Sequence, residues 1–482
     1  MILPSQLRRV MYLLAQRHSQ RPIDRTHQKL IGLMNGTCFE SAASRQYITR
    51  VLLDLTKLRY IQTTFQGYEP DIQNAIFRGR KFSFAASPNE TMIVEQRPTY
   101  LPFGRPDFSD EEIAAVTRVL RSGWVGMGPE VRAFEDELAS YVMAPQLVAV
   151  SSCTAALHLT LHALGVGAGD EVICPSLTWC SSANAALYVG ARVVFSDVDR
   201  DSCCSQPEDI LRCVTPQTRA VVVVHFGGYA IDVHALRRQV PAHVLIVEDA
   251  AHALGARYPD GSPVGSSGNP TCYSFYANKN LSTAEGGAVA LFDERLAESL
   301  RCLRQHAYPA DAWKRFNDRQ TVLTAPLEEL GFKANYTDLQ ASIGRVQLRR
   351  FEELQRRRLE IASYYCSRIE GMRPRLEWQA GICHNDHARH LFTIRLPIEQ
   401  LHITRDEFVR ELRKRNIGAT IHYTPLHQMP LYQERCGNLN LPHTDHLGMR
   451  IVTLPFSSSM TLPDACDVCD HLDECLRQFS SP

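Results

Sequence analysis

From Leu101 onward, short apolar runs alternate with longer stretches in which apolar residues recur every three or four positions. The short runs have the length of buried strands, and the stretches between them, such as TAALHLTLHAL and DVHALRRQV, have helical periodicity. This alternation predicts a mostly parallel sheet that helices cover on both faces. We therefore expect a large α/β domain at residues 96–338 with seven strands, at 147–150, 171–174, 192–195, 220–226, 244–247, 272–275 and 288–292.

After Asp338 the pattern changes to longer helices and fewer strands. A long helical run at 339–371 precedes a strand, HLFTIRL, and a capped helix that begins with Thr404-Arg405-Asp406-Glu407. A further strand is expected to end at Ile421-His422-Tyr423. These elements predict a smaller C-terminal α+β domain at residues 339–482.

The first 95 residues follow a different pattern. Two helical candidates, THQKLIGLMNG and SRQYITRVLLDLTKLRYI, come after a basic start, and the second has a repeat of three and four that fits one buried face. We predict a small helical module at residues 1–95, joined to the rest by a linker at 86–100. Its pattern resembles small winged-helix modules of the PqqD type, which hold peptides or partners. The alternative is an extension packed on the main body.

The composition excludes several classes of partner. The chain has 482 residues, with 52 Lys and Arg against 52 Asp and Glu, so no global field attracts nucleic acid or an anionic membrane. An anionic substrate must therefore be held by a local site. No apolar run approaches the ~20 residues of a membrane span.

The 15 cysteines are scattered through apolar segments, and the N-terminus does not read as a signal peptide. Reduced thiols in the cytoplasm are therefore expected. Cys466, Cys469 and Cys475, with His471 between them, have a spacing that partly fits zinc. No second pair completes such a site, so an amphipathic helix is the favoured interpretation and no metal is expected.

The chemistry centres on two residues at strand ends. A buried run, Val244-Leu245-Ile246-Val247, ends in Glu248-Asp249, and a second short strand leads into a polar loop that contains Lys279. Ligands of open α/β sheets bind beyond the carboxyl ends of the strands. Pyridoxal phosphate (PLP) requires a lysine for its aldehyde and an acid for its ring nitrogen. Asp249 and Lys279 fit these roles, although both features are also common without function.

Two other strand ends add to this picture. Ser151-Ser152-Cys153-Thr154 joins a strand directly to a helix, whose free N–H groups suit a phosphate, although plain N-capping explains the same residues. Trp179 follows the next strand, where an aromatic ring can stack on a pyridine ring or can simply pack in a core.

Dispersed motifs in this order resemble the DegT/DnrJ/StrS family of PLP-dependent nucleotide-sugar aminotransferases. The resemblance runs from about Leu101 to the C-terminus, and its nearest branch is that of the UDP-4-amino-4-deoxy-L-arabinose aminotransferases. The motifs include GWVGMGPEVRAFEDELASY, SSCTAALHLTLHALGVGAGDEVICPSLTWC, VEDAAHALGA, SFYANKNLSTAEGG, FKANYTDLQASIGRVQLRR and IHYTPLHQMPLY.

The resemblance implies a fold-type I aminotransferase and a homodimer with active sites at the subunit boundary. Lys279 matches the Schiff-base lysine and Asp249 the partner of the pyridinium. The other matches are Cys153 and Thr154 in the phosphate-binding turn, Trp179 as the stacking aromatic, Ser274 as a phosphate-binding hydroxyl, His252 near the phenolic oxygen, and Asn335 reaching the partner subunit's phosphate. His252 and Cys153 stand where many members have Gln and Gly.

The implied reaction transfers an amino group from L-glutamate to a nucleotide-linked 4-keto sugar. Relatives that dehydrate sugars have His in place of the lysine, so Lys279 argues against dehydration. Gln305-His306-Ala307 replaces the usual Asp-His-Gly of the family, which leaves the identity of the sugar open. A non-catalytic sensor that binds PLP or sugar on the same fold, with the N-terminal module as its effector, is the alternative.

Overall fold

The computed structural model describes residues 96–308, 327 and 329–481. The chain divides into two units after Glu90, and every described residue belongs to the second unit. The predicted N-terminal module at 1–95 lies outside the described residues, so both its fold and its expected partner stay predictions. The domain boundary expected after Asp338 also stays a prediction.

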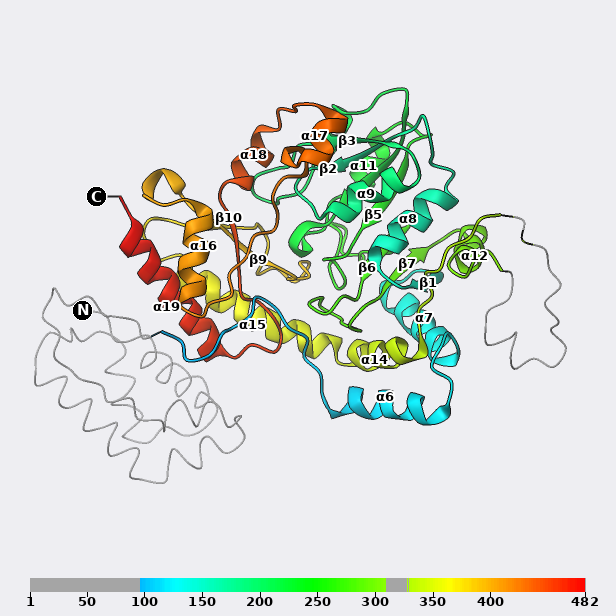
Figure 1. The fold of residues 1–482 in the computed structure, drawn as a ribbon, viewed down its shortest axis with the longest axis horizontal. Helices are drawn as coiled ribbons and strands as arrows, with labels where there is room; N and C mark the ends of the chain where they lie inside the picture. Colours follow the sequence, from blue (N-terminus) through cyan, green and yellow to red (C-terminus); the bar gives the residue numbers. More distant parts are fainter. Residues whose placement is uncertain (1–95, 309–326, 328, 482) are drawn as a thin grey trace, which may run out of the picture. The chain divides into compact units, whose positions relative to one another are not determined.

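A seven-stranded sheet forms the centre of the described part (Figure 1). Its strand order is β1-β7-β6-β5-β4-β2-β3, and β7 is antiparallel to both of its neighbours, while the other pairs are parallel. The seven predicted runs coincide with these strands within two residues, so the mostly parallel sheet is confirmed. The strands are β1 (Gln146–Val150), β2 (Glu171–Pro175), β3 (Arg192–Ser196), β4 (Thr218–Val224), β5 (Leu245–Asp249), β6 (Thr271–Ser274) and β7 (Gly287–Leu291).

Both faces of the sheet are covered, which explains why its strands read as continuous apolar runs. In β4, Val221 and Val223 belong to one core, whereas Ala220 and Val222 belong to the core on the other side. The first core includes α7 (Pro129–Val142) and α11 (Val233–Gln239). The second includes α8 (Cys153–Ala163), α9 (Cys180–Tyr188) and α12 (Glu294–Leu303).

Two consecutive helices connect the sheet to the C-terminal part. The predicted helical run consists of α14 (Asp338–Arg349), which packs on α6 (Asp110–Ser122) and α7, and α15 (Phe351–Ile369). Figure 1 shows α15 extending from α14 towards α19 (Leu462–Phe479) and α16 (Arg405–Lys414). A three-stranded antiparallel sheet lies there, in the order β10 (Ile451–Leu454), β9 (Phe392–Arg395), β8 (Glu377–Trp378).

The expected capped helix begins as predicted, because Thr404 and Glu407 form a capping box on α16. The strand predicted to end at Tyr423 is wrong, since the segment makes isolated bridges, from Ile417 to Leu101 and from Thr420 to Thr453, instead of a strand. His422 and Tyr423 instead use their side chains, and His422 Nδ1 lies 2.9 Å from Thr453 Oγ1. Residues 417–419 are buried and residues 420–423 are half-buried, so the segment reads as a short apolar run. Such a run does not by itself distinguish a strand from a loop that packs on the core.

The C-terminal cysteines lie on α19, which confirms the helical interpretation. Cys469 and Cys475 are buried in the core of the C-terminal part, against α15 and α16. Within the described residues, no group of three or more His, Cys, Asp or Glu is arranged to hold a metal ion. No helix among those residues is both long enough and apolar enough to cross a membrane.

Asp338 ties the start of α14 to the start of α7. Gly128, the N-cap of α7, has no side chain to cap the helix, and Asp338 Oδ1 accepts the N–H groups of Gly128 at 2.8 Å and Val131 at 3.1 Å instead. We predict that Asp338→Ala lowers the free energy of unfolding by about 1–2 kcal/mol, the cost of losing an N-cap. Urea unfolding of the full-length chain measures this.

Asp406→Ala serves as the matched control, because Asp406 is exposed and makes a surface ion pair with Arg405. Such a pair contributes less than about 1 kcal/mol. Equal unfolding midpoints for the two variants would show that Asp338 does not act as a cap.

Candidate active site

The carboxyl ends of neighbouring strands bring the predicted site residues together. Asp249 is the last residue of β5, Ser151 follows β1, and Lys279 lies in the loop between β6 and β7. Lys279, Asp249 and Cys153 are close enough to interact electrostatically. The two residues that the sequence placed at the centre of the chemistry therefore share one site.

Asp249 is a buried carboxylate held by neutral donors. Its Oδ2 accepts the hydroxyl of Ser182 at 2.7 Å, and its Oδ1 accepts the N–H of Ala251 at 3.1 Å. Burial raises the pKa of Asp249, while these hydrogen bonds and the Lys279 charge oppose the rise. A cationic ring nitrogen facing this carboxylate would offset the cost of burying its charge.

The amine of Lys279 is placed where its charge is disfavoured. Burial lowers the pKa of Lys279 to about 8, against the opposing attraction of Cys153 and Asp249. Its Nζ lies 3.5 Å from Nε2 of His390, a residue of the C-terminal part of the chain. A far larger fraction of the amine is therefore neutral, and hence nucleophilic, near neutral pH than for an ordinary lysine.

The turn that the sequence predicts to bind phosphate lies at the N-terminus of α8. Ser152 caps the helix by accepting the N–H of Ala155 at 3.1 Å, and Thr154 Oγ1 lies 2.7 Å from Ser181 Oγ. The Cys153 thiol is buried towards Asp249 Oδ1, 3.9 Å away, so only its backbone N–H is offered to a ligand. A side chain at Gly287 would collide with the backbone of Ser152 and Cys153, so glycine lets β7 approach the turn.

Trp179, Ser274 and His252 surround this centre. Trp179 precedes α9, and its side chain is 60% exposed, with its ring 5.8 Å from that of Tyr423. Ser274 ends β6, and its hydroxyl accepts the N–H of Tyr276 at 3.4 Å. His252 is buried, and burial holds the pKa of its ring well below the usual range.

Asn335 is placed apart from these residues. Its Oδ1 accepts a hydrogen bond from Lys333 Nζ at 2.7 Å, and its Nδ2 lies 3.9 Å from Met127 Sδ. The structure does not bring its side chain into contact with Lys279 or Asp249 of the same chain. This placement is compatible with the expected role of Asn335 towards another subunit, and that role stays a prediction.

Sequence analysis missed four residues that complete the site. Tyr423 Oη lies 3.3 Å from His252 Nε2, and the rings of His252 and His390 are 4.3 Å apart. Asn280 contacts His390, and Ser182 contacts Asp249. Tyr423 lies within the motif IHYTPLHQMPLY, which could have identified it. His390 was assigned only to a strand, and its place beside Lys279 comes from a contact between residues 111 positions apart.

These residues fit PLP. A lysine of lowered pKa suits the aldehyde, the buried Asp249 suits the ring nitrogen, and the start of α8 with its hydroxyl neighbours suits the phosphate.

Comparison with known proteins decides the family. Residues 106–473 match the DegT/DnrJ/EryC1/StrS aminotransferase family. The chain belongs to this family. The curated protein SpsC of Bacillus subtilis (strain 168), a spore coat polysaccharide biosynthesis protein, is 39% identical over 391 residues, which are 80% of this chain and 99% of SpsC.

Solved structures agree with this family. Spr1654 of Streptococcus pneumoniae in its PLP form is 29% identical with a TM-score of 0.72, covering 79% of this chain and 99% of that one. The aminotransferase TlmJ of Streptoalloteichus hindustanus is 32% identical with a TM-score of 0.71, and covers 79% and 99%. The fold-type I architecture and the PLP cofactor are thereby confirmed, and this chain is a PLP-dependent sugar aminotransferase.

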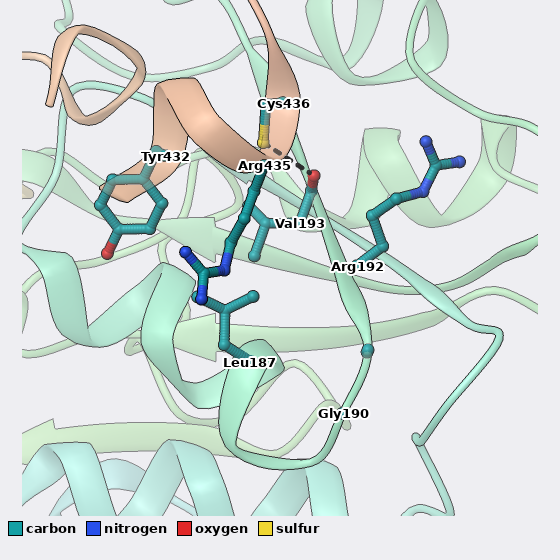
Figure 2. Close-up of a pocket in the computed structure, with 8 residues that line it drawn as sticks. Leu187, Gly190, Arg192, Val193, Tyr432, Arg435 and Cys436 are labelled. Carbon is teal, nitrogen blue, oxygen red and sulfur yellow. Dashed lines mark hydrogen bonds between the residues drawn. The ribbon is translucent and has the colours of Figure 1, made fainter. Parts of the chain in front are cut away.

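A pocket of about 300 Å³ lies away from these residues, between β3, the turn after α9, and α17 (Pro430–Cys436). Figure 2 shows Arg192 and Arg435 at its sides and the Cys436 thiol, which donates to Val193 O at 3.5 Å. None of the candidate site residues lines it.

The lowered pKa of Lys279 gives a pH-dependent prediction. The neutral amine attacks the PLP aldehyde, so the rate at which PLP attaches to the cofactor-free protein should rise with pH and level off above about 8. Borohydride reduction followed by mass spectrometry of the Lys279 peptide measures the attached cofactor.

Lys279→Arg keeps a positive charge but should give no adduct. A midpoint near 10.5, the ordinary value for lysine, would contradict the burial of the amine.

Proposed function

We propose that this protein transfers the amino group of L-glutamate to a keto carbon, C4, of a nucleotide-linked sugar. The observation that carries the proposal is the placement of Lys279, an amine of lowered pKa, beside the buried Asp249 in a chain of this aminotransferase family. The nearest branch expected from the sequence forms UDP-4-amino-4-deoxy-L-arabinose, and we keep the corresponding nucleotide-linked 4-keto sugar as the substrate class of the proposal. The amino sugar would serve glycan, lipopolysaccharide or natural-product synthesis in the cytoplasm.

Each candidate residue has a separate task in this proposal. PLP, when bound, supplies an electron sink for the carbon that loses its proton. Lys279 holds the cofactor and, once the amino donor replaces it, moves the proton between the donor carbon and the cofactor. Asp249 keeps the ring nitrogen protonated. His252 would interact with the phenolic oxygen of the cofactor, and Trp179 would cover its ring.

The phosphate is assigned to a different set of groups. The N–H groups at the start of α8 supply the positive end of a helix, and hydroxyl groups add donors beside it. The residues proposed for this task are Cys153 through its backbone, Thr154, Ser274, and Asn335 of a second subunit.

The test is an amino-transfer assay with purified full-length protein, PLP and L-glutamate. We expect one equivalent of 2-oxoglutarate per site without an acceptor, and continuous turnover with one member of a panel of nucleotide 4-keto sugars, identified by mass and NMR. Lys279→Arg should show neither reaction. A protein that binds PLP but releases no 2-oxoglutarate would instead be the non-catalytic sensor.

The homodimer gives a second prediction. If Asn335 reaches the phosphate in the other subunit, homodimers of either variant should have weak activity. Lys279→Ala lacks the amine, and in Asn335→Asp the new carboxylate repels the phosphate. Mixing the two should form heterodimers in which one site carries both defects and the other carries neither. Activity should therefore recover to about half of wild type per heterodimer.

Native mass spectrometry shows whether the mixed dimers form. Mixed dimers without recovered activity would show that each subunit owns a complete site. Mixing Lys279→Ala with Lys279→Arg is the control, because both defects then lie on the same residue and no intact site can form.

A further inference from the structure

His390 lies at the end of a chain of hydrogen bonds that fixes which of its nitrogens carries a proton. Asn280 donates through Nδ2 to the carbonyl of Ala388 at 2.6 Å, so its Oδ1 is directed at the His390 ring. His390 Nδ1 lies 3.1 Å from this oxygen. Because an amide oxygen only accepts hydrogen bonds, Nδ1 carries the ring proton.

The other ring nitrogen of His390 faces Lys279. Burial, together with the nearby charge of Lys279, holds the pKa of His390 well below its usual range, so the imidazole is neutral. A neutral ring with its proton on Nδ1 leaves the lone pair of Nε2 free. Lys279 Nζ is 3.5 Å from this nitrogen, which can therefore accept a hydrogen bond from the amine.

Two backbone hydrogen bonds hold His390 in place, and a packing contact holds its ring. The N–H of His390 donates to Gly227 O at 2.9 Å, and its carbonyl accepts from Arg358 Nη1 at 3.4 Å. Its ring packs on that of His252 with centroids 4.3 Å apart. Arg358 is itself buried, so this support is part of the core.

We propose that His390 is a positioning residue, whose Nε2 accepts a hydrogen bond from Lys279 and thereby directs the lone pair of the amine. The inference rests on the proposed function, since it concerns how that lysine attacks the cofactor. Among the described residues, His390 is the one whose side chain lies within hydrogen-bond distance of Nζ. The titratable groups that face Lys279 electrostatically are Cys153 of α8, Asp249 of β5, His252, His390 and His422.

The test compares His390→Phe with His390→Gln in the full-length, cofactor-free protein. Phenylalanine keeps an aromatic ring at this position but removes the acceptor Nε2. The plateau rate of PLP attachment should therefore fall about tenfold, as expected for one lost hydrogen bond. The midpoint of the pH profile should also move down, because the ammonium loses an acceptor that stabilised it. Glutamine places an amide oxygen near the position of Nε2 and should keep the rate within about threefold of wild type.

Asn280→Leu tests the assigned tautomer separately. Without Oδ1, the ring proton is free to move to Nε2, which then can no longer accept from Lys279. The plateau rate should fall several-fold although His390 is still present. His402→Phe is the matched control, because His402 is exposed and contacts Phe479 rather than the site.

The outcomes separate the two proposals. If the wild-type protein forms no borohydride-trapped adduct at Lys279, the proposed function fails. If it forms the adduct and His390→Phe has the wild-type plateau and midpoint, the positioning role is wrong while the function stands. Circular dichroism shows whether His390→Phe folds. If it does not, equal plateau rates of PLP attachment for wild type, His390→Gln and Asn280→Leu overturn the assigned hydrogen bond.

Discussion

Burial of an amine and a carboxylate in one space is the constraint on which the site depends. Either charge costs free energy when it leaves water, and a direct ion pair is the usual way to offset that cost. Among the described residues, Lys279 and Asp249 form no such pair. Asp249 is instead satisfied by Ser182 and Ala251, and Lys279 by His390. Neutral partners leave both groups available to a ligand that carries an aldehyde and a basic ring nitrogen.

The register of β5 decides which of two adjacent acids enters the site. Successive side chains of a strand point to opposite faces, so Glu248 and Asp249 have different surroundings. Burial alone would raise the pKa of Glu248, but hydrogen bonds from His225, Ser267 and Tyr258 lower it. All of these partners bind Glu248 within the core, away from the site. A shift of one residue would exchange the two acids. The apolar pattern of β5 therefore specifies the active site as well as the sheet.

The sequence predicted the sheet well because strands buried on both faces have a simple apolar pattern, and polar residues stand at or after the ends of the strands that carry the site. Lys279, Asp249 and the turn at Cys153 lie at such ends, so local pattern was enough to find them. His390 and Tyr423 lie within segments whose apolar neighbours suggested strands. Their roles depend on contacts with Lys279 and His252, which are separated from them by more than a hundred residues of chain. Local pattern carries no information about such contacts.

The distant contacts are made possible by the end of β4. Ala388 and His390 donate their N–H groups to the carbonyls of Gly228 and Gly227, both at 2.9 Å, so the segment that carries His390 is fastened to the large sheet by its backbone. A side chain at Gly228, whose φ is +108°, would collide with the backbone of Ala388 and Arg389. Glycine at this position thus allows His390, 162 residues later in the chain, to reach its place beside the amine of Lys279. The sheet supplies the reactive groups, but their orientation requires the C-terminal part of the same chain.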